Sequence, residues 1–227
     1  MGETDIPIGG TCDPAFAAVE EMFRENFASR HEIGAGVCVY KDGEKVVDLW
    51  GGHRDAARTE PWEENTIVLM NSVVKSICAL SVHVLADQGR VDLDAPVADY
   101  WPEFAQNGKE GILVRHVQGH ECGAIFSASA KPGDWFDYPA QCAAIAAQPP
   151  AFPAGTKGAY NTINIGFILG EVVRNVTGKT IGTFIREEIS EPLGAEYNLG
   201  LTPDEAALCA TMHTNPENKF WSAGAQS

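Results

Sequence analysis

A serine and a lysine stand three residues apart at the start of the most continuously hydrophobic helical stretch of the chain, as Ser72-Val-Val-Lys75. Three residues are almost one helical turn, so the hydroxyl and the amine point the same way. A serine is a weak nucleophile near neutral pH unless a base takes its proton, and a lysine can act as that base when burial lowers its pKa. The spacing therefore predicts nucleophilic catalysis by Ser72, with Lys75 as its base.

The same four residues have a structural interpretation, in which Ser72 caps a helix and Lys75 is a solvated surface residue. Nine serines and eight lysines in 227 residues give roughly 0.3 such pairs by chance. The residues that follow favour catalysis, because they are apolar on nearly every side and predict a buried helix. A charged lysine is costly there, and the helix N-terminus would stabilise an oxyanion near Ser72, whose own backbone amide is a candidate donor.

Composition sets limits on the class of protein. The chain is 44% hydrophobic, enough for a substantial core, and its net charge of −15 argues against nucleic acid or an anionic membrane as a partner. The sequence has no run of eighteen or more apolar residues and no basic start followed by an apolar stretch, which predicts neither membrane insertion nor secretion. Six scattered cysteines without a Cys-x-x-Cys pair are typical of reduced thiols, so we expect a cytoplasmic protein.

A pair of histidines, His116 and His120, has the four-residue spacing that can present two metal ligands on one helical face. Gly119 and Gly123 interrupt that helix, and no acidic residue that could activate water lies between the histidines. We therefore expect neither a metal nor another cofactor.

The pattern of apolar and turn residues predicts an early helix against a sheet and a later, mainly helical part. Asp13 is a good N-cap before Pro14, and the Asp42-Gly43 pair is a strong hairpin signal. A loop rich in Pro and Gly over residues 148–155 leads to Tyr160. The expected elements are a helix from about residue 13, antiparallel strands at 34–40 and 45–50, and helices from about 72 to 88, at 164–175 and at 180–189.

Further short motifs accompany Ser72-Val-Val-Lys75 along residues 33 to 205. They are Val46-Val-Asp-Leu-Trp-Gly-Gly52, Val91-Asp-Leu-Asp-Ala-Pro-Val97, Tyr100-Trp-Pro-Glu-Phe104, Val114-Arg-His116, Pro153-Ala-Gly155, Tyr160, Gly170-Glu-Val-Val-Arg174, Val176-Thr-Gly-Lys179 and Glu191-Pro-Leu-Gly194. Each is weak alone, but the ordered set resembles the serine β-lactamase and penicillin-binding-protein superfamily. The nearest resemblance is to the class C β-lactamase-like esterases, or family VIII carboxylesterases.

The resemblance implies an α/β plus all-α fold of the β-lactamase/transpeptidase-like kind, in which an antiparallel sheet flanked by helices lies beside a helical domain. It also implies that Ser72 attacks a small ester, amide or lactone, that Lys75 accepts or relays the proton, and that Tyr160 passes it to the leaving group. The alternatives are an acyltransferase or a β-lactamase of this fold, or a catalytically silent binding or scaffold protein. Tyr160 itself has the alternative of a buried aromatic with a locally bonded hydroxyl.

Three departures from the family pattern stand in this sequence. Tyr160-Asn-Thr162 replaces Tyr-x-Asn, and His120-Glu-Cys-Gly123 replaces His-x-Ser-Gly. The third motif, Lys-Thr-Gly, His-x-Gly or Trp-x-Gly on a strand after the tyrosine, is not found. Substrate-binding residues stay unassigned, although three aromatic residues are candidates for an apolar acyl site or for the core: Trp135, Phe136 and Tyr138.

We expect residues 1–88 to form the N-terminal part of the α/β domain with the nucleophile helix, and residues 89–227 to be mainly helical. The C-terminal strands of the α/β domain are expected to be missing from this chain, which would leave a marginal two-stranded sheet. Three interpretations follow: a fragment of a longer protein, a second chain that supplies the missing part, or a non-catalytic remnant. We favour the first two. A remnant would expose an apolar face, and such a face would favour association into a homo-oligomer.

Overall fold

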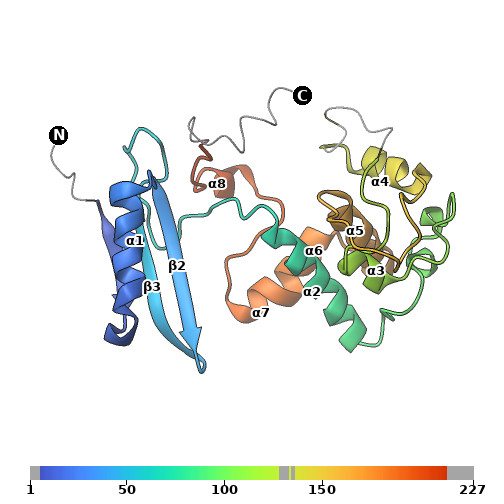
Figure 1. Cartoon of the computed structure of the whole chain (residues 1–227), viewed down its shortest axis with the longest axis horizontal. Coiled ribbons are helices and arrows are strands. Elements are labelled where there is room, and N and C mark those ends of the chain that lie inside the picture. Colours follow the sequence, from blue (N-terminus) through green and yellow to red (C-terminus); the bar gives the residue numbers. More distant parts are fainter. Residues whose placement is uncertain (1–5, 128–132, 134–135, 214–227) are drawn as a thin grey trace. The chain divides into compact units, whose positions relative to one another are not determined.

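The computed structural model describes residues 6–127, 133 and 136–213 (Figure 1). Its strands are β1 (Ile8–Cys12), β2 (Gly34–Lys41) and β3 (Glu44–Gly52). Its α-helices are α1 (Ala17–Ser29), α2 (Val73–Asp87), α3 (Val114–Gln118), α4 (Tyr138–Ala147), α5 (Asn164–Thr177), α6 (Ile181–Ile185), α7 (Glu191–Leu193) and α8 (Pro203–Ala206). Short 3₁₀ turns lie at Pro14–Phe16, Val97–Asp99 and Pro102–Phe104, and a π-helical turn lies at Arg186–Ser190.

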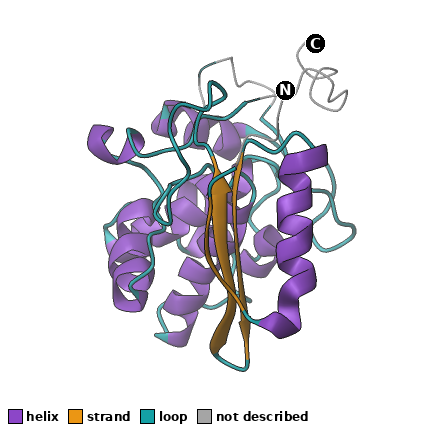
Figure 2. Cartoon of the chain, turned by 90° about the vertical axis from the view of Figure 1, so that its left-hand side faces the viewer, coloured by secondary structure: helices purple, strands orange, loops and turns teal. Residues whose placement is uncertain are grey.

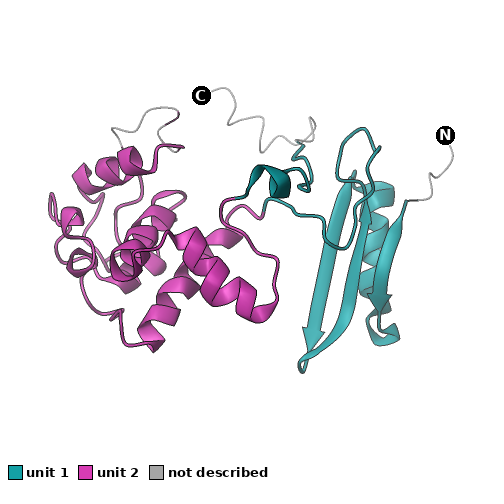
Figure 3. Cartoon of the chain, turned by 180° about the vertical axis from the view of Figure 1, so that it is seen from behind, with its two compact units in different colours: residues 1–69, 201–227 teal, residues 70–200 magenta. Residues whose placement is uncertain are grey.

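The chain divides into two compact units (Figure 3). Unit 1 comprises residues 1–69 and 201–227, and unit 2 comprises residues 70–200. The division differs from the expected one after residue 88, because the nucleophile helix α2 packs on helices α5 and α6 of unit 2. A sheet-containing part and a helical part are nevertheless both present, as the predicted fold class requires.

Unit 1 contains an antiparallel sheet with the strand order β1-β3-β2. The predicted hairpin is confirmed, since β2 and β3 pair antiparallel around Asp42 and Gly43. Both turn residues have a left-handed φ, +52° and +83°, which is the backbone geometry that two-residue hairpins prefer.

The expectation of a two-stranded sheet was wrong, because β1 adds a third strand to β3. Its sequence Ile-Gly-Gly-Thr-Cys lacks the alternation that marks a strand. The glycines are needed for close approach: a Cβ on Gly9 would lie 2.8 Å from the Trp50 indole nitrogen, and one on Gly10 would lie 1.9 Å from the Asp48 carbonyl oxygen. The close approach of β1 to β3 therefore requires glycine at these positions, and glycine does not give the sequence pattern from which a strand is predicted.

Helix α1 covers one face of this sheet, as predicted (Figure 2). The Asp13 carboxylate accepts a hydrogen bond from the Ala15 amide at 2.8 Å and caps the turn that leads into the helix. Phe23 and Phe27 are buried against strand β3, with their rings in edge contact. This cluster is the core of unit 1.

Unit 2 is helical and is built around α2 and α5. Buried side chains of α2, such as Val82 and Leu85, share one core with the apolar side of α5 and with α6. The prediction that α2 is buried on nearly every side was wrong, since Val73 and Leu80 are 46% and 41% exposed. Only one side of α2 faces α5 and α6. No helix among the described residues has the length and apolar character needed to cross a membrane.

Lys109 is a fully buried lysine in unit 2. Its amine donates hydrogen bonds to the carbonyl oxygens of Gln106, Ala146 and Gln148 at 2.7, 2.8 and 2.6 Å. These bonds use all three ammonium donors and tie the end of α4 to the loop before α3.

Candidate active site

Ser72 lies at the first turn of α2, directly after Asn71, whose φ of +45° is left-handed. Its side chain makes no capping hydrogen bond, so the structural interpretation of this serine is wrong. Instead, the Lys75 amine donates a hydrogen bond to the Ser72 hydroxyl oxygen at 3.0 Å. The lysine is half-buried rather than fully solvated. The predicted meeting of hydroxyl and amine on one helical turn is thus present.

Tyr160 comes to the same place from the loop before α5. The Lys75 amine lies 5.0 Å from the centroid of its ring. Hydrogen bonding with Ser72, and then with Lys75, holds the pKa of the Tyr160 phenol below its usual value. The side chain is 55% exposed, which is not the buried aromatic of the alternative interpretation. The three residues predicted to be catalytic are therefore brought together within unit 2.

His120, which the sequence presented as one of two possible metal ligands and as the start of the altered His-x-Ser-Gly motif, packs against Tyr160 with 4.8 Å between ring centroids. Its Nδ1 accepts a hydrogen bond from the main-chain amide of Asn161 at 3.0 Å, whereas Nδ1 of His116 accepts one from the main-chain amide of Leu113 at 3.2 Å. Each histidine is thus engaged with a different part of the main chain. Among the described residues, no group of three or more His, Cys, Asp or Glu side chains is placed to hold a metal ion.

The asparagines of the tyrosine motif point into the protein. Asn161 is fully buried, donates to the Ala124 carbonyl oxygen at 3.1 Å, and accepts from the Ile165 amide at 2.9 Å. It also donates to the sulfur of Cys122, the residue that replaces the family serine, at 3.8 Å. Asn164 donates to the same Ala124 carbonyl at 3.2 Å. These side-chain amides hold the start of α5 against residues 122–124 and so fix the segment that carries Tyr160.

An apolar cavity of about 430 Å³ has Lys75 in its wall. Its lining comes from α2, from Tyr138, from residues 162, 163 and 165–167 around the start of α5, and from residues 180–182 and 199. Burial raises the pKa of the Cys78 thiol in this wall to about 11, so the thiol stays neutral. Of the three candidate aromatics, Tyr138 lines the cavity, Phe136 is 94% exposed, and Trp135 lies outside the described residues.

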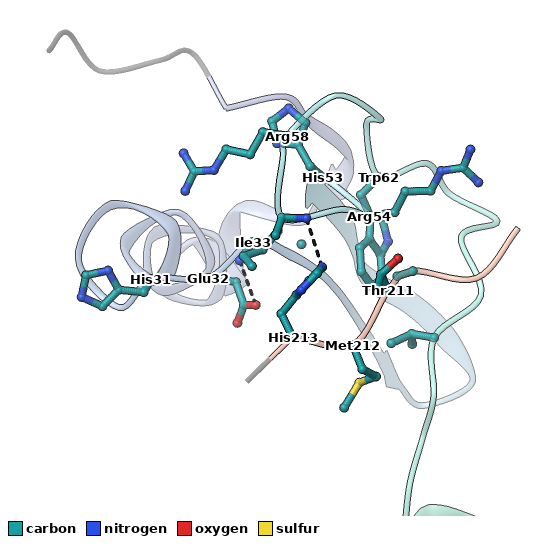
Figure 4. Close-up of a pocket in the computed structure, with 14 residues that line it drawn as sticks. His31, Glu32, Ile33, His53, Arg54, Arg58, Trp62, Thr211, Met212 and His213 are labelled. Carbon is teal, nitrogen blue, oxygen red and sulfur yellow. Dashed lines mark hydrogen bonds between the residues drawn. The ribbon is translucent and has the colours of Figure 1, made fainter. Parts of the chain in front are cut away.

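A larger cavity of about 690 Å³ lies within unit 1 (Figure 4). Its wall includes Trp62 and three histidines from separate segments, His31, His53 and His213. His213 accepts a hydrogen bond from the Ala56 amide at 3.1 Å, which fixes the imidazole to the main chain. None of the predicted catalytic residues lines this cavity. The smaller cavity beside Lys75 is therefore the one that suits acyl chemistry.

The chain belongs to the Beta-lactamase family, whose sequence model matches residues 19–227. The esterase/beta-lactamase LipL of Mycobacterium tuberculosis is 37% identical over 198 residues, which are 87% of this chain and 46% of LipL. A penicillin-binding-protein homologue from Caulobacter crescentus has a similar fold, with a TM-score of 0.88 and 40% identity over 92% of this chain and 57% of that one. A family VIII carboxylesterase structure gives a TM-score of 0.86 and 40% identity over 91% and 57%.

These similarities confirm the resemblance and the β-lactamase/transpeptidase-like fold predicted from the sequence. The chain spans about half the length of the relatives that it matches.

Proposed function

We propose that the protein is a serine hydrolase of the esterase type, which acts through an acyl-Ser72 intermediate. The observation that carries the proposal is the 3.0 Å hydrogen bond from the Lys75 amine to the Ser72 hydroxyl oxygen. Tyr160, whose phenol interacts with both, adds a second group able to move a proton. Relatives named as an esterase/beta-lactamase and a family VIII carboxylesterase support this reaction class.

In the proposed reaction, the Ser72 oxygen attacks the carbonyl carbon of the substrate and its proton moves to the Tyr160 phenolate. Tyr160 thus takes the role of base that the sequence spacing predicted for Lys75, because the Lys75 amine donates to the Ser72 oxygen. The lowered pKa of Tyr160 favours this phenolate, and the Lys75 amine stabilises it while donating to the Ser72 oxygen. When the tetrahedral intermediate collapses, Tyr160 returns the proton to the leaving alcohol or amine. Water then attacks the acyl carbon and gives a proton to the Tyr160 phenolate. Tyr160 returns that proton to the Ser72 oxygen as the acid is released, which restores the phenolate and the free serine.

The first turn of α2 supplies one donor for the oxyanion. The amides of Val73, Val74 and Lys75 are bonded to the carbonyl oxygens of Met70, Asn71 and Ser72, respectively. The Ser72 amide has no acceptor among the described residues, so it can donate to the developing oxyanion.

We propose that the substrate is a small ester, amide or lactone whose apolar group enters the 430 Å³ cavity beside Lys75. That volume lies in the range of small-molecule pockets, and its wall offers mainly apolar side chains. An acyl group with an apolar chain loses less hydration against this mainly apolar wall than a charged one would.

Two further expectations remain proposals. All six cysteines are free, which supports a reducing, cytoplasmic location. Strand β2 lies at the edge of the described sheet, so its outer side could pair with further strands from a continuation of the chain or from a second copy or chain. Size-exclusion chromatography with light scattering will show whether the protein self-associates.

The test is labelling by a fluorophosphonate, with the Ser72→Ala variant and a matched Ser76→Ala control one turn further along α2. We expect native protein and Ser76→Ala to be labelled and Ser72→Ala to remain unlabelled. A native protein that never reacts, or equal labelling in Ser72→Ala, would refute the proposal. Hydrolysis of a cephalosporin would indicate a β-lactamase, and transfer of the acyl group to an added alcohol or amine would indicate an acyltransferase. Ligand binding without turnover would indicate a silent binding protein.

A further inference from the structure

His120 contacts the Tyr160 segment in three ways. Its carbonyl oxygen accepts a hydrogen bond from the Ala159 amide at 2.9 Å, and its ring Nδ1 accepts one from the Asn161 amide at 3.0 Å. Its imidazole packs against the phenol ring, with 4.8 Å between centroids and 44° between planes. One residue therefore holds both main-chain neighbours of Tyr160 and contacts its ring.

The main chain at His120 is itself fixed in an uncommon conformation. Its φ of +60° is left-handed, a region that histidine enters more readily than most residues with a side chain. The next amide, of Glu121, donates to the His116 carbonyl oxygen at 2.7 Å, and the Glu121 carbonyl accepts from the Gly155 amide at 3.0 Å. The segment after α3 thus forms a fixed support for the loop that carries Tyr160.

The hydrogen bond to Asn161 requires a neutral imidazole. Because Nδ1 is the acceptor, the neutral ring carries its proton on Nε2. Burial, and then the positive charge of Lys75, lower the pKa of His120, so the neutral ring predominates near neutral pH. The support is therefore intact in the pH range where a serine hydrolase of this kind would work.

We propose that His120 is a positioning residue, which holds the Tyr160 phenol beside the Ser72 hydroxyl and the Lys75 amine. The catalytic part of this inference rests on the proposed function, whereas its geometric part rests on the three contacts. Tyr160 is 55% exposed and comes from a loop, so its side chain would otherwise have rotamer freedom to lose at each reaction. A phenol held in place beforehand avoids that loss.

The test compares two substitutions at His120 that leave its carbonyl oxygen in place. His120→Gly accepts the left-handed φ and removes the ring with its acceptor. His120→Asn also tolerates this φ and offers a side-chain oxygen, as far from Cα as Nδ1, to the Asn161 amide. His83→Asn, at an exposed position of α2, is the matched control.

Two quantities are measured in each folded variant. The first is the rate of Ser72 phosphonylation at saturating fluorophosphonate, with the half-saturating concentration, and the second is the titration of the Tyr160 phenol. The titration is followed by NMR of ¹³Cζ-labelled tyrosine and assigned with Tyr160→Phe. We expect His120→Gly to lower the saturating rate at least tenfold, to change the half-saturating concentration less than about threefold, and to raise the pKa of Tyr160. His120→Asn should recover most of the rate, and His83→Asn should behave as native.

A folded His120→Gly protein with the native rate and the native Tyr160 titration would overturn the inference, and so would a lower rate with an unchanged titration. If the glycine variant does not fold, the Tyr160 resonance of native protein is followed as the pH falls through the pKa of His120, where the protonated ring can no longer accept from the Asn161 main-chain amide. The inference predicts a second inflection there, and its absence would overturn the inference. If native protein is not labelled at Ser72, the proposed function fails. The titration still decides whether His120 positions Tyr160, because it requires no turnover.

Discussion

Two lysines of unit 2 lie in regions that use an ammonium group in different ways. Lys109 is fully buried, its three donors are all taken by main-chain carbonyl oxygens, and burial lowers its pKa. Lys75 is half-buried and donates to a hydroxyl, with a phenol ring 5.0 Å from its nitrogen. A lysine whose ammonium group donates all its hydrogen bonds to main-chain carbonyl oxygens can hold loops together. A lysine that contacts a hydroxyl and a phenol can assist proton transfer between them.

The largest expected difference comes from removing each amine by the same substitution. Lys75→Met should lower the rate of Ser72 acylation by about 10³-fold, because the serine and the phenol lose the group that stabilises their charge. Lys109→Met should leave that rate unchanged in folded protein but lower the free energy of unfolding by about 3 kcal/mol, because three buried carbonyl oxygens lose their donor. The initial release of p-nitrophenol from a p-nitrophenyl ester measures the acylation rate, and urea denaturation measures the free energy of unfolding. Equal effects of both variants on the rate would contradict the distinction.

Tyr160→Phe should have the next largest effect, about a 10²-fold loss of acylation rate, since it removes the phenol oxygen and keeps the ring. The pKa of Tyr160 is lowered, so its phenolate form is populated at lower pH than in free tyrosine, and native activity should fall as the pH drops through this lowered pKa. The rate measured against pH should therefore rise to a plateau in native protein. The variant should lack that rise, and an identical pH profile would rule out Tyr160 as the base.

The smallest effect is expected in the cavity wall. Gly166 lines the apolar cavity, and a Cβ added there would meet nothing within 4 Å, so the side chain introduced by Gly166→Leu can start there without a clash at Cβ and occupy part of the cavity. We expect the variant to discriminate against esters with longer acyl chains by roughly tenfold while acetyl ester hydrolysis stays nearly native. Gly111→Leu, at another open position, is the control. If the variant and the native protein prefer the same acyl chain length, the apolar group of the substrate does not bind in this cavity.

Parts of this account could be read from the sequence because their causes are local. Ser72 and Lys75 share one helical turn, and Asp42-Gly43 specifies its own hairpin. Tyr160 was identified only from the order of several family motifs, since no local pattern links it to a helix 85 residues earlier in the chain. The role of Tyr160 was therefore predicted from the family resemblance and not from residue spacing.

The features that the sequence did not reveal depend on distant partners. Strand β1 needs Gly9 and Gly10 for its close approach to β3, and glycine is the weakest strand signal. Lys109 stands between Gly108 and Glu110, where a surface lysine is the ordinary expectation, and two of its acceptors lie 37 and 39 residues away. His120 accepts a hydrogen bond from a main-chain amide 41 residues later in the chain, and its spacing from His116 carries no sign of that partner.

An acyl group bound to Ser72 can be detected directly by mass spectrometry. The protein is mixed with a p-nitrophenyl ester, quenched in acid before deacylation is complete, digested, and mapped by mass spectrometry. We expect the acyl mass on the peptide that contains Ser72, with fragment ions that locate it on that serine, and no acyl mass in Ser72→Ala. Ester turnover with no acyl group on Ser72, or with the same turnover in Ser72→Ala, would contradict it.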